Sequence, residues 1–75
     1  MPKLPHLSGK EIIKALSKTG FQVTRQKGSH VILVKLTTGG KVAVVVPYHK
    51  EVDIGTLIEI IREAGLKREE FLSLL

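Results

Sequence analysis

The stretch that decides the fold runs from residue 21 to residue 47 and reads FQVTRQKGSHVILVKLTTGGKVAVVVP. Its first part, Phe21–Arg25, alternates apolar and polar residues, which predicts a strand on a half-buried sheet. Residues 30–36 and 42–46 are apolar and mostly β-branched, which predicts two further strands. Short turns containing glycine separate the three strands, so they form an antiparallel meander. The turns are predicted at residues 26–28 and 37–41.

One helix is predicted before this meander in the sequence, and others are predicted after it. Ser8–Glu11 has the spacing of a capping box, which predicts a first helix that ends at Thr19–Gly20. Asp53 is the predicted N-cap of a second helix that runs to about Ala64. Residues 68–75 predict a short C-terminal helix. The order predicts an α+β fold of the α-β-β-β-α type, in which helices pack on one face of a three-stranded antiparallel sheet.

The second and third strands are apolar on both faces, because Ile32 and Val34 point one way while Val31 and Leu33 point the other. An antiparallel sheet with one face in water alternates apolar and polar residues instead. Two explanations stay open. Either β-propensity alone selected these residues, or a partner or a second copy of the chain covers the second face. In the second case we expect Val31, Leu33 and their neighbours in the third strand to form the extra contact.

Length and composition bound the class of protein. The chain has 75 residues, of which 43% are hydrophobic, and no cysteine. We expect one domain over residues 1–75, with residues 1–7 partly flexible. The lack of cysteine excludes a disulfide scaffold and a cysteine-based zinc site. No apolar run is long enough for a transmembrane helix, and the N-terminus lacks the apolar stretch of a signal peptide. We therefore expect a cytoplasmic protein.

Positive charge is concentrated in the first two thirds of the chain. Residues 1–50 hold nine Lys or Arg and one acid, a net 9 − 1 = +8, while residues 51–75 hold three Lys or Arg and six acids, a net 3 − 6 = −3. The sum is the overall net charge of +5. Positive charge gathered in one segment indicates a polyanion as partner, although a generic basic protein has the same signature.

Motifs for most chemistries are missing. The three histidines, His6, His30 and His49, lack the spacing of a metal site, so we expect no metal and no cofactor. The sequence has no phosphate-binding glycine loop and no GxSxG nucleophile motif. Histidine acting as an acid or a base is the chemistry that remains.

His30 has the neighbours that cleavage of RNA requires. Arg25, Lys27, Gly28 and Ser29 precede it within six residues. An imidazole, with an unperturbed pKa near ~6.5, can take the proton of a 2′-hydroxyl. Lysine and arginine can stabilise charge on the phosphate oxygens, and backbone N–H groups around a glycine can approach a phosphate closely. From the residues alone, a structural histidine at a strand end is the more frequent case.

The chain resembles the HicA toxin family of bacterial and archaeal toxin–antitoxin systems over about residues 4–75. The segment Gly28-Ser29-His30 and the segment Gly55-Thr56-Leu57, in this order and separation, are the most specific part of the resemblance. Further matching segments are Ser8–Glu11 with Leu16, Gly20-Phe21, Arg25–Lys27, Val46–His49, Ile60–Arg62 and Ala64–Leu66.

The resemblance implies a fold like the double-stranded-RNA-binding domain and a type II toxin that cleaves single-stranded mRNA without a metal. It places the catalytic histidine at His30 and implies that a HicB-type antitoxin holds the toxin inactive. We expect Lys10, Arg25, Lys27, Gly28 and Ser29 to bind the RNA phosphates. A homo-oligomer through the second sheet face is a further expectation, and no membrane contact is expected.

Two segments depart from the family pattern. Residues 51–54, Glu-Val-Asp-Ile, stand where the family often has basic residues and a proline, which affects substrate or antitoxin contact there. Lys67 stands where the family often has a serine that caps the last helix, so this helix is expected to fray.

Other functions fit the residues less well. A non-catalytic RNA-binding module has the same element order, but it usually carries lysines at the start of its second helix, where this chain has Asp53. An RNA reader that stacks bases on its sheet needs sheet aromatics, and the second and third strands have none. A DNA-binding regulator needs a helix with a basic recognition face, which is also missing.

His49 is a possible assistant to His30. Cleavage by the 2′-hydroxyl uses a base and, at the leaving oxygen, an acid, and one imidazole cannot be both at once. His30 lies seven residues before Thr37 and His49 lies eight after Lys41. Because the two strands are antiparallel, we expect both histidines at the same end of the sheet. The alternative is that His49 is a solvated loop residue.

Overall fold

The computed structural model describes residues 3–75 and contains three helices and three strands in that range. No helix among these residues has both the length and the apolar character needed to cross a bilayer. The chain order is α-β-β-β-α-α, as the α+β prediction requires. The elements are α1 (Gly9–Ser17), β1 (Gln22–Lys27), β2 (His30–Thr37), β3 (Gly40–Pro47), α2 (Ile54–Glu63) and α3 (Arg68–Leu72).

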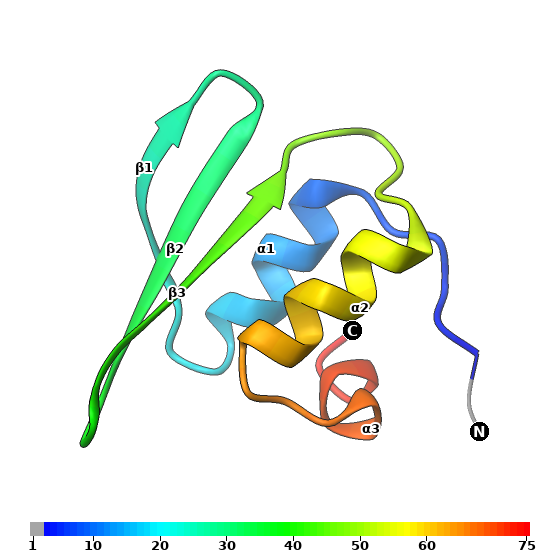
Figure 1. Ribbon diagram of the computed structural model, residues 1–75. Helices are drawn as coiled ribbons and strands as arrows, with labels where there is room; N and C mark the ends of the chain where they lie inside the picture. Colours follow the sequence, from blue (N-terminus) through cyan, green and yellow to red (C-terminus); the bar gives the residue numbers. More distant parts are fainter. Residues whose placement is uncertain (1–2) are drawn as a thin grey trace.

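The three strands form one antiparallel sheet in the order β1-β2-β3, and α1 and α2 lie on the same side of it (Figure 1). The inner face carries Val31 and Leu33 of β2, which pair with Val46 and Val44 of β3. All four side chains are buried, together with the apolar faces of both helices. This layer is the hydrophobic core, and burial of its apolar surface is the main force that holds helices to sheet.

The prediction that Val31 and Leu33 form the second sheet face was wrong. Val31 and Leu33 belong to the face that the helices cover. The face without helices carries Ile32 and Val34, and Val45 of β3 pairs with Ile32 on that side. The inner face is the one against which the helices pack. Because β2 and β3 are apolar on both faces, their sequence does not show which face that is.

β1 also differs from its prediction as a half-buried strand. Every residue of β1 is exposed, because the helices pack mainly against the β3 side of the sheet (Figure 1). The buried residue of this segment is Phe21, which lies just before the strand. β1 also ends at Lys27, two residues later than predicted.

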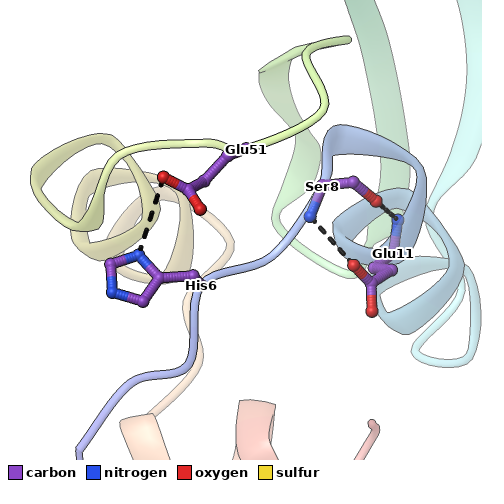
Figure 2. Close-up of polar contacts among 4 residues, drawn as sticks. All are labelled: His6, Ser8, Glu11 and Glu51. Atoms are coloured by element: carbon purple, nitrogen blue, oxygen red, sulfur yellow. Dashed lines mark hydrogen bonds and ion pairs between the residues drawn. The ribbon is translucent and has the colours of Figure 1, made fainter.

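The predicted capping box at the start of α1 is confirmed. The N–H of Glu11 donates to the Ser8 hydroxyl oxygen at 3.1 Å, and the Glu11 carboxylate accepts from the N–H of Ser8 at 3.0 Å (Figure 2). The third helix is shorter than predicted and ends at Leu72. The Lys67 side chain makes no capping bond, but its N–H donates to the Glu70 carboxylate at 2.8 Å.

The N-terminal segment contacts the loop before α2. Leu7 is buried and forms an isolated β-bridge with Val52, which is buried as well. His6 lies 4.0 Å from the Glu51 carboxylate, measured from its Nδ1 atom (Figure 2). Residues 1 and 2 of the segment predicted to be partly flexible lie outside the described residues. Its flexibility stays a prediction.

Gly9, the first residue of α1, touches the end of β3. A Cβ atom at this position would lie 2.2 Å from the Pro47 carbonyl oxygen and 2.9 Å from the Cα atom of Tyr48. Real Cβ atoms do not approach backbone so closely, so glycine alone fits here without a shift of the helix. Glycine is therefore required here by the close approach of the Pro47 and Tyr48 backbone. Backbone conformation does not require it, because the φ of Gly9 is not positive.

Replacement of Gly9 by alanine should lower the free energy of unfolding by about 1–3 kcal/mol, because α1 must move away from β3. Gly39→Ala is the matched control, since a Cβ there meets nothing closer than 4.0 Å and the φ of Gly39 is not positive. We expect the control to stay within about 0.5 kcal/mol of wild type in urea unfolding. Equal stability of the two variants would contradict the close contact.

Candidate functional site

A two-residue turn places Lys27 directly opposite His30. The strands β1 and β2 pair at Lys27 and His30, and only Gly28 and Ser29 lie between them. Gly28 has a φ of 60° and Ser29 has a negative φ, the sign pattern of a type II′ turn. Cross-strand partners lie about 4.5–5.5 Å apart at Cβ and point to the same face. The turn therefore places the Lys27 and His30 side chains at neighbouring positions on one face of the sheet.

A second cation lies on the same face, and a bulge in β1 turns the neighbouring apolar residue away from it. Val23, Arg25 and Lys27 would share one face of a regular strand. The register shifts between Val23 and Arg25, so that Val23 pairs with the buried Leu33 whereas Arg25 pairs with Ile32 on the outer face. The bulge thus separates the apolar residue from the two cations. His30, Lys27 and Arg25 lie on the helix-free face and are exposed.

The side chain of His30 opens onto a hollow of about 320 Å³ that we call the histidine hollow. It lies where the sheet meets the start of α2, and His49 lines it as well. The antiparallel pairing thus brings both histidines to the same end of the sheet, as the count along the strands predicts. The full lining is His30, Val45, Pro47, His49, Val52, Asp53 and Thr56.

Two backbone hydrogen bonds fix the loop that carries His49. The N–H of Tyr48 donates to the carbonyl of Ser29 at 2.6 Å, which ties this loop to the Gly28–Ser29 turn. The N–H of Gly9 donates to the carbonyl of His49 at 2.9 Å, which ties it to α1. His49 is exposed but follows a backbone held on two sides. A loop held in this way loses less entropy when it binds a ligand.

Asp53 begins α2 and borders the histidine hollow. Its carboxylate accepts from the N–H of Thr56 at 3.0 Å and from the Thr56 hydroxyl at 2.8 Å. The hydroxyl, followed by the N–H, lowers the pKa of Asp53 below its ordinary value of 3.8. Although His30, His49 and Asp53 line one hollow, residues 3–75 contain no group of three acidic or histidine side chains placed to hold a metal ion. The expectation that the protein works without a metal ion stays a prediction.

Lys10, the remaining predicted phosphate ligand, borders a neighbouring hollow of about 240 Å³, which we call the tyrosine hollow. His49 lines both hollows, so the two are adjacent. The sequence reasoning missed Tyr48, Lys50, Asp53 and Thr56 as lining residues, because their placement depends on how α1 and α2 meet the end of β3. The lining of the tyrosine hollow is Ser8, Lys10, Tyr48, His49 and Lys50.

A family model described as the HicA toxin of bacterial toxin–antitoxin matches residues 9–66 of the chain. That span is more than half of the 75 residues and contains α1, the whole sheet and α2. The chain belongs to the HicA toxin family. The match begins later and ends earlier than the resemblance seen in the sequence, and α3 lies outside it. A search of curated proteins finds no match.

Membership of the HicA family makes this chain a toxin component of a toxin–antitoxin system. Such a system includes an antitoxin, so the toxin has a protein partner. The matched residues include all those that line the histidine hollow. Of the three histidines, His6 alone lies before the matched span, and it contacts Glu51 outside both hollows.

The lowered pKa of Asp53 makes a pH-dependent contribution to stability. A carboxylate whose pKa is lower in the folded chain stabilises the fold above the unfolded-state pKa, and the contribution disappears as the pH falls through the folded-state value. Asp53→Asn keeps the side-chain shape but has no charge. We expect the wild type to exceed this variant in stability at neutral pH, and the difference to shrink below pH 3.8. Urea unfolding over a pH series measures this, and a difference that does not vary with pH would contradict it.

Proposed function

We propose that this HicA family toxin is a metal-independent endoribonuclease that cleaves unpaired mRNA in the cytoplasm, with His30 as its acid–base residue. The observation that carries the proposal is the position of His30. It is exposed on the helix-free face, lies opposite Lys27 and shares a hollow with a second histidine. The sequence resemblance, which places the family's catalytic histidine at His30, supports the same assignment.

The reaction consists of one displacement at phosphorus. One imidazole takes the proton of the 2′-hydroxyl, and the 2′-oxygen attacks the adjacent phosphorus. The bond from phosphorus to the 5′-oxygen breaks, and a second acid gives that oxygen a proton. A cyclic phosphate remains on one fragment and a 5′-hydroxyl on the other. His30 and His49 are two groups able to exchange protons at one hollow, and we assign His30 the principal role.

Lys27 and Arg25 provide the positive charge that the phosphate requires. Both lie on the face that carries His30, since Lys27 pairs with His30 itself and Arg25 pairs with Ile32. Cations placed there stabilise the charge that develops on the non-bridging oxygens. Nothing lies within 4 Å of the position where a Cβ of Gly28 would stand, so the backbone of the turn is open to a phosphate. Ser29 is exposed in the same turn.

Recognition of duplex RNA is disfavoured by the charges on α2. A double-stranded-RNA-binding domain uses cations at the start of this helix to span phosphates. Here Asp53 caps the helix, and Arg62 forms an ion pair with Glu59. The cations that face away from the helices lie on the sheet instead. This distribution supports an unpaired strand that crosses the end of the sheet.

We assign the partner to the HicB type, with an acidic surface that covers the His30 face of the toxin. Residues 1–50 carry a net charge of +8, so an acidic contact surface would associate quickly and in the correct orientation. Beside the cations, the exposed Val45 and the half-buried Ile32 give the partner an apolar area to bury. The same face would otherwise bind RNA, so the antitoxin competes directly with the substrate.

Substitution of His30 tests the enzymatic proposal. His30→Ala should cleave RNA roughly 10²–10⁴-fold more slowly than wild type, because the acid–base group is lost. His6→Ala is the matched control, since His6 lies outside both hollows, and it should cleave at the wild-type rate. Cleavage rates are measured in excess EDTA, where the wild type should remain active.

Three results would contradict the proposal. They are wild-type rates in a folded His30→Ala protein, loss of wild-type cleavage in EDTA that a divalent ion restores, and a toxin–antitoxin complex that still cleaves RNA at the rate of the free toxin.

The pH dependence of cleavage tests the role of His49. If one histidine removes a proton and the other donates one, the rate should follow a bell-shaped curve against pH. His49→Ala should remove one limb of that curve and should slow cleavage less than His30→Ala does. An unchanged curve in the His49→Ala protein would show that His49 takes no part.

A further inference from the structure

We propose that the tyrosine hollow binds one unpaired nucleobase of the RNA, stacked on Tyr48, next to the phosphate that is cleaved. The inference rests on the proposed function and names a substrate feature that this site would select. It makes Tyr48 a specificity-determining residue beside the histidines.

Tyr48 is the one aromatic side chain of this protein that a ligand can reach. The chain has three aromatic residues, and both phenylalanines are buried, Phe21 at 2% and Phe71 at 0% exposure. Tyr48 is 48% exposed. A half-exposed ring supplies one face for stacking, and every base has a face to stack on it. The Tyr48 hydroxyl makes no hydrogen bond within residues 3–75, so the ring is not held for an internal polar contact.

The backbone of Tyr48 is fixed before any ligand arrives. Its N–H donates to the Ser29 carbonyl at 2.6 Å, and the next residue accepts a bond from Gly9. Gly9 also packs directly against the Cα atom of Tyr48. A ring on an immobile backbone loses little entropy on binding, which favours a stacking role over that of a loose surface tyrosine.

The charges around the hollow suit a nucleotide. Lys10 and Lys50 line it, whereas no carboxylate does. Two acids adjoin the lining residues in sequence. The Glu11 carboxylate accepts from the N–H of Ser8 at 3.0 Å, and the Glu51 carboxylate lies 4.0 Å from Nδ1 of His6. Two lysines beside an aromatic ring can hold the phosphates on either side of a stacked base. An apolar ligand without negative charge would leave both cations unused.

Continuity with the histidine hollow sets the position of the base. His49 borders both hollows. A phosphate held at His30 and Lys27 is therefore followed, after about one nucleotide, by a base at Tyr48. A base can reach the ring only when it is not stacked in a duplex. The hollow would consequently select unpaired RNA at the cleavage point, which the sheet face, without aromatics, cannot do.

Intrinsic fluorescence gives a direct readout of stacking. Tyr48 is the only tyrosine and the chain has no tryptophan, so the tyrosine emission of the protein reports on this ring alone. The probe is a short oligouridylate with 2′-O-methyl groups, which lacks the 2′-hydroxyl that cleavage uses. We expect this oligomer to quench the emission. The same sugar–phosphate chain without bases should leave the emission unchanged, because it has phosphates but nothing to stack.

Two substitutions separate stacking from simple burial. Tyr48→Leu keeps an apolar side chain without a π face. Because neither variant has a tyrosine to emit, affinities are measured by titration calorimetry, in which Tyr48→Leu should bind the oligouridylate roughly 5- to 150-fold more weakly than wild type. Tyr48→Phe keeps the ring and should bind as wild type does. Both variants should bind the base-free chain equally well. Equal affinity of Tyr48→Leu and Tyr48→Phe for the oligouridylate, or quenching by the base-free chain, would overturn the proposal.

The binding assay remains informative if the proposed reaction fails. Non-cleavable RNA measures the base site without any chemistry. His30→Ala loses one phosphate contact as well as the acid–base group, so it is compared at saturating oligouridylate, where the fluorescence quenching should be retained. Loss of cleavage in His30→Ala with intact quenching supports both proposals. Wild-type cleavage in His30→Ala with intact quenching would overturn the assignment of His30 and leave the base site in place.

Discussion

The contact between Gly9 and the end of β3 is the constraint on which the site depends. A helix that begins against the Pro47 carbonyl leaves no room for a side chain at its first residue, and its N–H then reaches the carbonyl of His49. The helix start, the strand end and the histidine loop are therefore one packed unit. A shift of α1 by the width of a methyl group would move both hollows, because Ser8 and Lys10 border one and His49 borders both.

The sheet supplies the other half of the site, and it does so through register. The Gly28–Ser29 turn fixes Lys27 opposite His30, while the Ser29 carbonyl holds the N–H of Tyr48. One turn thus connects the cation, the imidazole and the loop that carries the second imidazole. Alternation along β1 places Arg25 on the same face as Lys27, and the bulge turns Val23 to the opposite face. A change of register by one residue would reverse the faces of all these side chains, whereas apolar pairs such as Leu33 with Val44 hold the register in place.

Local signals in the sequence predicted the elements well, and long-range contacts decided what the sequence could not predict. The caps at Ser8 and Asp53 are formed by residues three apart, so the sequence contains everything they need. The meeting of His30 and His49 followed from counting along antiparallel strands. The inner face of the sheet, the full exposure of β1 and the close approach at Gly9 all depend on where the helices pack. Two apolar faces look alike in sequence. The alternation of residues 21–25 predicts a regular strand, and nothing in it indicates the bulge between Val23 and Arg25.

The division of charge along the chain has a structural meaning at the histidine hollow. Its sheet side carries His30 with Lys27 and Arg25 nearby, and its helix side begins with Asp53. The carboxylate of Asp53 is held by Thr56 at the positive end of α2, which lessens its repulsion of a phosphate. In the proposed function, a phosphate would still be drawn to the sheet side of the hollow, toward His30, and away from the helix. For the proposed RNA substrate, the net negative charge of α2 and α3 would favour approach across the sheet end, toward Lys10 and Lys50. The acidic surface of the proposed antitoxin would experience the same field, so that substrate and inhibitor would be directed to one face by the same charges.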